Sequence, residues 1–583
     1  MSMNSAGTIS RWLLGLTKPF WRNILLSIIL QVVTILAGIG LLATSAWLIS
    51  KAALQPSIAD LGLAPVAVRF FGISRAVFRY MERLVTHNVT FRLLANLRVW
   101  FYTAIEPLAP ARLMHYRSGD LLERVVSDIN TLENVYARVI APPVVALIVA
   151  GAITPFFYAA DPMIALILLA FMVFTGTAVP LWTWWSGKTT GQQIVQSRAE
   201  INALLVDMIQ GIADSIAYGY TQSQLTALDG LTQNIATHEN KAATQAGLEA
   251  VVSTLLVNVA ALVILVMAIP RVDGLLLATL TLGTIAAFEA VTPISIAMQH
   301  LGANLSAADR LLEIASESPQ VSDSATSSPH PQDYGLNIRN LSFRYNADDA
   351  LVFDQLSLTM NMGQKVAIVG ASGAGKSTLT NILLRFWDYE GGEITLGGHD
   401  LRAYQSSDLY DIFGVMSQRT HLFNTTIREN IHIARKEAAE DAIIAAAKQA
   451  QIHDFIQSLP NGYNTMVGEN GVNISGGERQ RIALARVLLK KAQCFILDEA
   501  TANLDSVTEQ KLMESILTVT QNRSMILMTH RLALLEHIDH IFVLQNGRIA
   551  EQGTHNKLLA TRGLYHRLWL AQKQAAVFNE AGI

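Results

Sequence analysis

Long apolar runs dominate the first half of the chain, and short ones dominate the second half. Residues 24–49 contain no charged side chain, and this run exceeds the roughly 20 residues that a helix needs to cross a bilayer. Further runs of spanning length are expected at about 60–80, 139–160, 162–185, 247–269 and 274–298. The pattern therefore predicts an all-α membrane domain of six spans over residues 21–315, extended by helices on the cytoplasmic side.

An amphipathic stretch precedes the first span. Residues 8–20 combine two aromatic side chains, Trp12 and Phe20, with basic ones. We expect residues 1–20 to form an elbow at the membrane interface, with these two rings toward lipid. A surface helix of a soluble part is the alternative. The first span is too long for the apolar part of a signal peptide, so it is expected to be retained.

A linker separates the two halves. Residues 316–335 are rich in serine and proline and have no apolar period, which is typical of an irregular connection. Residues 336–583 then alternate short β-rich runs with helical ones. This alternation predicts an α/β domain built on a largely parallel sheet.

Positive charge is distributed unevenly among the connections between the spans. The connections after the first, third and fifth spans are short and carry little of it, whereas those after the second and fourth are long and basic. The positive-inside rule therefore places both termini and the long connections in the cytoplasm. The basic residues of the long connections are Arg92, Arg98, Arg112, Arg117, Arg124, Lys188, Arg198 and Lys241.

The composition agrees with a membrane protein and excludes several kinds of binding site. Charged residues make up 15% of the chain, against about 25% in an average soluble domain. The net charge of −3 creates no field for nucleic acid. The one cysteine, Cys494, excludes a disulfide framework and a cysteine metal cage, and its apolar surroundings predict a small core residue.

Ionisable side chains recur along the second span. They are Arg69, Arg75, Arg79, Arg83 and His87. Charge inside a span is costly, so it indicates a cavity that holds an anionic cargo. Haem is one candidate, with His87 as axial ligand and arginines on the propionates, and the carboxylates of a small peptide are another. Glu289 of the sixth span is a candidate partner for one of the arginines. The alternative is a span that ends early, with these residues in a solvated extension.

A glycine-rich loop lies between a short β-rich run, residues 365–369, and a helix-prone run, residues 379–387. Its pattern, G-x-x-x-x-G-K-S, in this context predicts a phosphate-binding loop, against the alternative of a chance glycine-rich turn. Lys376 is expected at the β- and γ-phosphates and Ser377 on Mg²⁺. The loop residues are Gly370, Ala371, Ser372, Gly373, Ala374, Gly375, Lys376, Ser377 and Thr378.

A second apolar run, residues 494–499, ends in two carboxylates. Asp498 is expected to act on Mg²⁺, and Glu499 to polarise the attacking water. The turn Ser475-Gly476-Gly477 precedes this run and opens a helical segment that starts at Glu478. It is a second helix N-terminus suited to an anion, so the two turns suggest a shared nucleotide.

Taken in order, these motifs resemble those of the ATP-binding cassette (ABC) family. The resemblance implies ATP and Mg²⁺ as cofactors, and it implies that Tyr345 stacks on adenine. Gln418 resembles the glutamine that senses Mg²⁺ and the membrane domain, and His530 the switch histidine at the γ-phosphate. Taken singly, Tyr345 and His530 would be ordinary core or surface residues. Glu469 resembles the loop residue that touches the intracellular helices of exporters.

Two further motifs complete the resemblance. Residues 502–505 resemble the D-loop, and Ser475 to Glu478 resemble the signature. The signature here begins with isoleucine and ends with glutamate, where the family usually has leucine and glutamine. Ser475 and Gly477, which face the nucleotide in the family, are present. The change puts symmetric behaviour of the two ATP sites in doubt.

Six spans followed by one cassette resemble a half-transporter of the exporter type. In that family ATP lies between the phosphate loop of one cassette and the signature of the other, so a dimer is required. Four membrane-side stretches are similar to the CydC-type subunits of the CydDC family: 38–50, 78–98, 116–142 and 288–302. This resemblance implies a CydD-like partner in the bacterial inner membrane. It also implies export of thiols (cysteine or glutathione) or haem in support of cytochrome bd assembly.

Three alternatives differ in class. A lipid or drug exporter of the same architecture predicts an apolar cavity, which the charged second span disfavours. A regulatory membrane protein that binds ATP or haem without transport is disfavoured by Glu499 and His530. A soluble P-loop enzyme is disfavoured by the uncharged length of the first span. We expect alternating access driven by ATP binding and hydrolysis.

Overall fold

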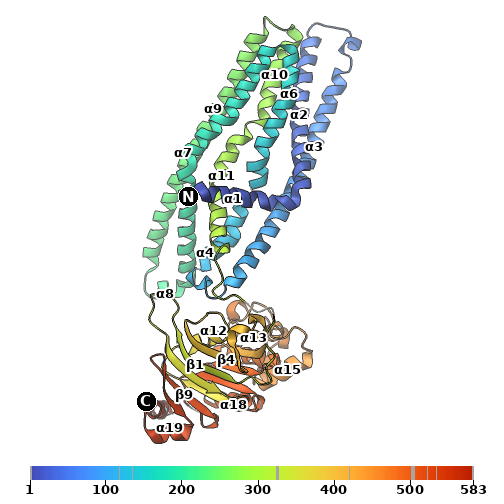
Figure 1. The fold of residues 1–583 in the computed structure, drawn as a ribbon. Helices are drawn as coiled ribbons and strands as arrows, with labels where there is room; N and C mark the ends of the chain where they lie inside the picture. The colour runs from blue at the N-terminus through green and yellow to red at the C-terminus, as the bar shows by residue number, and fades with distance from the viewer. Residues whose placement is uncertain are drawn as a thin grey trace. The chain divides into compact units, whose positions relative to one another are not determined.

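The computed structural model describes residues 3–116, 118–133, 135–323, 327–418, 420–500, 506–521, 523–532 and 535–580. The chain divides into two compact units, and the boundary falls between Ser318 and Pro319. The first unit is a bundle of long helices, and every described strand lies in the second unit (Figure 1). Each unit is described by itself below.

The first unit consists of long helices joined by short turns. Its principal helices are α1 (Met3–Thr17), α2 (Trp21–Ala52), α3 (Ala64–Ile105), α4 (Ser118–Glu123), α6 (Ala141–Ala160), α7 (Pro162–Gln210), α8 (Ile212–Ala217), α9 (Thr221–Ala268), α10 (Gly274–Ala287) and α11 (Pro293–Ala315). Two π-helical turns, η5 (Arg124–Asp128) and η6 (Val135–Ile140), lie between α4 and α6, with the single turn α5 (Ile129–Thr131) between them. The 3₁₀ turn η7 (Phe288–Ala290) separates α10 from α11.

Within the described residues, five helical stretches are long and apolar enough to cross a membrane. They are Arg11–Ala52, Gly119–Ala160, Pro162–Gly187, Thr221–Ala268 and Gly274–Ala315. The expected second span lies on α3, which is not among the five and which carries the recurring arginines. α3 packs along α2, so it belongs to the same bundle.

The spanning helices share an apolar core. Buried side chains of α2, α6, α7, α9 and α10 form one cluster, and it includes Ile35, Val149, Leu168, Ile264 and Leu280. Their helical spacing gives each helix one buried face, and the remaining apolar side chains face outward, as a lipid environment permits.

The N-terminal elbow packs onto the bundle. Ile9 and Leu13 of α1 are buried, and the Trp12 ring lies 5.0 Å from the Trp100 ring of α3, between centroids. Phe20 also packs against the buried apolar clusters. Both rings therefore pack on the bundle on one side while they stay partly exposed, and the expectation that they face lipid stays a prediction.

A buried ion cluster joins α11 to the turn η5. Asp128 is 1% exposed, and both of its carboxylate oxygens accept hydrogen bonds from the Arg310 guanidinium. Arg124 donates to the backbone oxygen of Arg310 at 2.6 Å and to the Glu313 carboxylate at 3.0 Å. Buried charges persist only when they are paired, so these contacts hold α11 and η5 in one arrangement.

The second unit contains two sheets. The larger has the strand order β10-β9-β3-β8-β7-β6, and the smaller has the order β2-β1-β4-β5 with antiparallel pairing. The strands are β1 (Leu336–Phe343), β2 (Phe353–Met360), β3 (Lys365–Val369), β4 (Gly391–Leu396), β5 (His399–Asp400), β6 (Phe413–Met416), β7 (Cys494–Asp498), β8 (Ser524–Thr529), β9 (His540–Gln545) and β10 (Arg548–Gly553). The expected parallel core is confirmed, because β3, β6, β7, β8 and β9 run parallel.

The parallel register brings three strand ends to one edge. Val369 of β3 pairs with Thr529 of β8, and Asp498 of β7 pairs with Met528. Because the carboxyl ends of parallel strands open into the same crevice, the loops that follow β3, β7 and β8 meet there. Cys494 begins β7 fully buried, as predicted, and burial raises the pKa of its thiol to about 12.

Helices pack against these sheets. They are α12 (Lys376–Leu383), α13 (Ser406–Ile412), α14 (Ile427–His432), α15 (Glu440–Gln449), α16 (His453–Ser458), α17 (Gly476–Lys490), α18 (Ser506–Val519), α19 (His555–Thr561) and α20 (Leu564–Glu580). The expected helix after the phosphate loop begins at Lys376 and ends at Leu383, four residues before Trp387, with Leu384 closing its last turn.

The start of the second unit is tied to this α/β body. Arg385, which follows α12, is 8% exposed and donates to Asp323 at 3.0 Å and to the backbone oxygen of Ser322 at 3.2 Å. The same guanidinium donates to the backbone oxygen of Tyr404 at 2.5 Å. The described part of the expected linker is therefore held by specific polar contacts.

Candidate functional site

The phosphate loop takes its shape from glycines. Gly373 and Gly375 have φ of +82° and +98°, a region that other residues rarely adopt. A Cβ on Gly375 would lie 2.9 Å from Cγ1 of Val352, and one on Gly370 would lie 2.7 Å from the backbone oxygen of Leu544. The predicted order of strand, loop and helix is therefore present as β3, loop and α12. At Gly370 and Gly375 the surroundings leave no room for a Cβ.

Lys376 spans the loop from within. It is 5% exposed, and its Nζ donates to the backbone oxygens of Gly370 at 2.9 Å and Ala371 at 3.1 Å. Burial lowers the pKa of the ammonium, while the nearby Glu499 and Asp498 act in the opposite direction. The positive charge thus lies at the base of the loop whose N–H groups can receive phosphate oxygens.

A hydroxyl and a carboxylate meet beside the loop. Ser377 Oγ donates to Oδ2 of Asp498 at 2.5 Å. Asp498 is 3% exposed, and its Oδ1 has no hydrogen-bond partner among the described residues. Burial raises the pKa of Asp498, and the hydrogen bond from Ser377 partly offsets this.

This oxygen pair fits a magnesium ion. Mg²⁺ prefers oxygen ligands and is usually held by one or two protein groups, substrate phosphates and water. In the described part of the chain, no group of three or more His, Cys, Asp or Glu side chains is placed to hold a metal alone. Ser377 and Asp498 are therefore suited to an ion that arrives with a nucleotide.

Glu499 is held by two polar partners at the end of β7. Its Oε1 lies 2.9 Å from Nδ1 of His530, and its Oε2 accepts a hydrogen bond of 2.7 Å from Nε2 of Gln418. Partial burial acts to raise the pKa of Glu499, but the hydrogen bond and charge of His530 and the bond from Gln418 outweigh it, so the net pKa is lowered. Glu499 therefore stays a carboxylate, the form that can accept a proton from water.

The three side chains come from separate segments. Glu499 has a φ of +51°, and its backbone N–H donates to the Met528 oxygen of β8 at 2.8 Å, which turns the chain sharply after β7. Gln418 follows β6 and uses its amide nitrogen on Glu499, which leaves its carbonyl oxygen as the atom that can ligate an ion. Gln418 and His530 are exposed, whereas the Glu499 side chain is 10% exposed.

Tyr345 lies next to the phosphate loop. Its hydroxyl and that of Thr378 are 2.9 Å apart, and its ring packs edge-on against Phe343 and Trp387. The side chain is half-buried. This position can offer an aromatic surface to a base whose phosphates occupy the loop.

The signature opens α17 through a capping box. Ser475 Oγ accepts from the Glu478 N–H at 3.3 Å, and Oε2 of Glu478 accepts from the Ser475 N–H at 2.8 Å. Gly476 is exposed and Gly477 is partly exposed. Among the described residues no hydrogen bond joins this group to the phosphate loop or to Asp498. The D-loop prediction, residues 502–505, and the loop residue Arg117 lie outside the described residues.

In the first unit, the structure brings three of the predicted cargo residues together. Glu289 of η7 accepts from Arg75 at 3.0 Å and from Arg79 at 2.7 Å, both from α3. Arg75 Nε is buried without a hydrogen-bond partner among the described residues. Arg69, Arg83 and His87 are exposed on the same helix. The pairing of Glu289 with an arginine was predicted, and the cargo role stays a prediction.

His87 is not part of the ion pair. Its ring stacks on Phe91 one turn further along α3, with centroids 6.0 Å apart and planes at 22°. An exposed imidazole in this position has a ring nitrogen that is available to ligate a metal.

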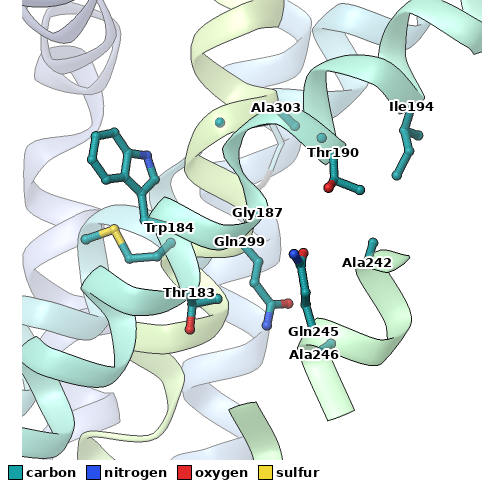
Figure 2. Close-up of a pocket in the computed structure, with 13 residues that line it drawn as sticks. Thr183, Trp184, Gly187, Thr190, Ile194, Ala242, Gln245, Ala246, Gln299 and Ala303 are labelled. Carbon is teal, nitrogen blue, oxygen red and sulfur yellow. The ribbon is translucent and has the colours of Figure 1, made fainter. Parts of the chain in front are cut away.

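The first unit also contains a hollow that the sequence did not predict. It has a volume of about 190 Å³ and lies between α7, α9 and α11 (Figure 2). Gln245 and Gln299 extend into it with Thr183, and Gln245 Nε2 donates to the Ser186 oxygen at 2.8 Å. The polar lining residues come from three helices that lie far apart in the sequence, so they leave no local sequence signal.

Comparison with known proteins gives consistent results. The family described as ABC transporter matches residues 353–502. The glutathione/L-cysteine transport system ATP-binding/permease protein CydC of Escherichia coli (strain K12) is 34% identical, over 95% of this chain and 98% of the relative. The corresponding CydD protein of Bacillus subtilis (strain 168) is 34% identical, over 96% and 98%. A solved bacterial Atm1-family ABC exporter with ATP bound has a TM-score of 0.84 at 25% identity, over 94% of this chain and 98% of that one.

Proposed function

The chain belongs to the ABC transporter family, among the CydC- and CydD-type ATP-binding/permease proteins, and from this premise we propose that it is one half of a heterodimer that exports a small anionic cargo. It is an ATP-hydrolysing, multi-pass protein of the bacterial inner membrane with the ABC exporter fold. The proposed partner is a CydD-like half-transporter, and the proposed orientation has both termini and the cassette in the cytoplasm.

The charged group on α3 and η7 carries the cargo proposal. Arg75 and Arg79 of α3 pair with Glu289. Arg83 lies one turn further along the same helix, next to Glu82, so three guanidinium groups outnumber two carboxylates. Positive charge in excess at this depth is costly unless a cavity or an anion receives it. The arrangement therefore supports a cargo that carries carboxylates.

Two cargo classes meet this requirement. Relatives named for glutathione and L-cysteine transport favour a thiol, and glutathione carries two carboxylates. Haem carries two propionates, and the exposed His87 next to Phe91 favours it because an imidazole nitrogen can ligate haem iron. We propose the thiol as the primary cargo and haem as the second candidate, in support of cytochrome bd assembly.

The proposed hydrolysis site uses residues already close together. Lys376 and the loop N–H groups bind the β- and γ-phosphates, and Tyr345 stacks on adenine. Ser377, Asp498 and the Gln418 oxygen hold Mg²⁺, which when bound neutralises charge on these phosphates. Glu499 takes a proton from the attacking water, and His530 keeps Glu499 oriented through their 2.9 Å contact.

The partner completes the site in this proposal. The group Ser475 to Glu478 has no bond to the phosphate loop of its own chain among the described residues, which supports a role toward the nucleotide of the other cassette. ATP then closes the two cassettes and hydrolysis reopens them. Cargo can bias this cycle only by binding the two states with different affinity.

ATPase activity in lipid nanodiscs tests the proposal. The chain is purified with its partner and titrated with glutathione or haemin while the haem Soret band is recorded, for wild type and His87→Ala. Stimulation by glutathione that is unchanged in His87→Ala supports the thiol, and stimulation by haemin with a Soret band that His87→Ala alters supports haem. Turnover that neither compound changes contradicts an anionic cargo of these classes.

A further inference from the structure

Glu289 occupies a break in the last spanning stretch. The helical hydrogen bonding of α10 stops at Ala287, η7 carries Glu289, and α11 begins anew at Pro293. Proline lacks the N–H that would continue the preceding helix, so the break is part of the backbone design. A carboxylate on this turn is attached to a segment that can change shape more easily than a regular helix can.

Both oxygens of Glu289 are engaged by α3. Nη2 of Arg75 lies 3.0 Å from each oxygen, and Nη2 of Arg79 lies 2.7 Å from Oε1. Two guanidinium groups on one carboxylate leave the group with positive charge in excess. Arg83, one turn further along α3, has no hydrogen bond or ion pair with any described residue.

The group has one closed side and one open side. Gly38 of α2 forms the closed side, because a Cβ at this position would lie 3.2 Å from Nε of Arg75 and 3.4 Å from Oε2 of Glu289. On the other side, the side chains of Arg79 and Glu289 remain 54% and 37% exposed. A ligand can therefore reach the guanidinium groups from the side away from α2.

We propose that Glu289 is an internal counter-ion that a carboxylate of the cargo displaces from Arg75 and Arg79. The inference rests on the proposed function, and it adds a role to one residue of the same site. Without cargo, Glu289 satisfies the two guanidinium groups at membrane depth. With cargo, the incoming carboxylate takes its place, and a second carboxylate on the same molecule can pair with Arg83.

Displacement links the cargo to the helix that leads out of the first unit. Release of Glu289 frees η7, and α11 follows directly from that turn to Ala315. α11 also carries Arg310, whose bond to Asp128 holds its far end. Cargo binding thus acts on the start of α11, while Arg310 holds its far end. The contacts of Glu289 then differ between the states with and without cargo, as a two-state change requires.

A purely structural ion pair predicts the opposite response to mutation. If Glu289 only stabilises the bundle, its removal leaves two unpaired guanidinium groups and weakens folding and every ligand interaction together. If Glu289 competes with the cargo, its neutralisation removes the competitor and strengthens carboxylate binding. The sign of the affinity change therefore separates the two roles.

The test measures carboxylate affinity in the heterodimer, purified in nanodiscs, by calorimetry. The probes are glutarate, as a minimal dicarboxylate, and glutathione. Glu289→Gln is the main variant, and Glu289→Asp is the second, because a side chain shorter by one methylene cannot keep the contacts to both arginines. The matched control is Glu249→Gln, a 6%-exposed carboxylate of α9 that is bonded to Ser253 at 2.9 Å.

The glutarate dissociation constant is expected to fall about 10-fold in Glu289→Gln, which corresponds to about 1.4 kcal/mol. The dissociation constant of Glu289→Asp is expected to lie between those of wild type and Glu289→Gln. That of the control Glu249→Gln is expected to stay within about twofold of wild type, because residues that share no partner rarely affect each other. Unchanged or weaker glutarate binding in both Glu289 variants overturns the counter-ion role. Failure of glutathione to stimulate ATP turnover in wild type overturns the proposed cargo instead, and the glutarate result stands apart from it.

Discussion

The Ser377 hydroxyl donates a 2.5 Å hydrogen bond to Asp498, across a sequence separation of 121 residues. This contact joins the start of α12 to the end of β7 and leaves Oδ1 of Asp498 buried without a partner among the described residues. The order of strands in the sheet therefore places these two oxygen groups side by side. An ion that enters with ATP meets an oxygen pair whose geometry the sheet has already set.

Glu499→Gln should slow ATP turnover of the heterodimer while ATP still binds. The glutamine keeps the shape and can still meet Gln418 and His530, but it cannot accept a proton from water. General-base loss commonly costs about 10²–10⁴-fold at the site that it serves, so turnover of the heterodimer should fall to the share that the second composite site contributes. Phosphate release measures the rate, and filter binding of labelled ATP measures retention.

A variant on the surface of the same cassette is the control for effects of mutation and purification on turnover. Glu514 of α18 is exposed, and its carboxylate is bonded only to Gln510 among the contacts described, so Glu514→Gln should retain wild-type turnover. Turnover of Glu499→Gln equal to that of this control would contradict a proton-accepting role for Glu499.

Tyr345→Ala should weaken ATP binding more than Tyr345→Phe does. Stacking of an aromatic ring on a base contributes about 1–3 kcal/mol, so the alanine variant should lose about 5- to 150-fold in affinity. Phenylalanine keeps the ring and loses only the hydroxyl contact with Thr378, so a change of under about threefold is expected. Fluorescent ATP titration measures both, and equal losses in the two variants would assign the effect to the hydroxyl rather than to stacking.

The cassette was predictable because its chemistry is local. The strand from Lys365 to Val369 and the strand that ends at Asp498 were recognisable from apolar runs that stop at glycine or at acids. What sequence could not supply was the side-chain pairing, such as Tyr345 with Thr378 or Glu499 with His530. These contacts depend on the order of strands in the sheet, which joins segments distant in sequence.

The buried faces of the membrane helices were harder to predict from the sequence, for a physical reason. In a bilayer, apolar side chains suit both lipid and protein partners, so periodicity does not tell which face is buried. The amphipathic pattern predicted a lipid-facing Trp12, and it did not predict the contact of this ring with Trp100. The pairing of Glu289 with Arg75 and Arg79 was predictable in kind, because charge in a span needs a partner, but Gly38 as the closed side of that group was not.

Asp128→Asn should destabilise the first unit strongly. The substitution leaves the Arg310 guanidinium without its buried carboxylate, and breaking one partner of a buried pair costs about 3–5 kcal/mol. The matched control is Glu239→Gln, because the pair of Arg198 and Glu239 is 60% and 49% exposed and should contribute under about 1 kcal/mol. Thermal unfolding of the purified complex compares the two, and similar midpoints for both variants would contradict a structural role for the buried pair.

Cys494 should resist alkylation in the native protein. Burial raises its thiol pKa to about 12, so at pH 8 the group is both neutral and inaccessible. N-ethylmaleimide should label it only after denaturation, and because the chain has one cysteine, mass spectrometry reads the result directly. Stoichiometric labelling of the native complex at pH 8 is the contrary outcome.

The same thiol gives a dependence of stability on pH. The folded-state pKa is raised, so the unfolded chain loses its proton first, at a pH near 9, and the folded chain near 12. The contribution to stability is therefore complete below pH 9 and declines between pH 9 and 12, by at most about 1.4 kcal/mol per pH unit. Cys494→Ala should flatten that part of the profile relative to wild type.

ATP-driven accumulation of labelled glutathione in proteoliposomes, with the cassettes facing outward, tests the central claim most directly. The heterodimer that contains this chain should accumulate glutathione with ATP and Mg²⁺, and Glu499→Gln should reduce accumulation at least 10-fold on the scale set by loss of a general base. Arg79→Ala should reduce it while ATP binding stays at the wild-type level. If wild type and Glu499→Gln accumulate neither labelled glutathione nor haem above vesicles without protein, the chain is not part of an exporter of this cargo class.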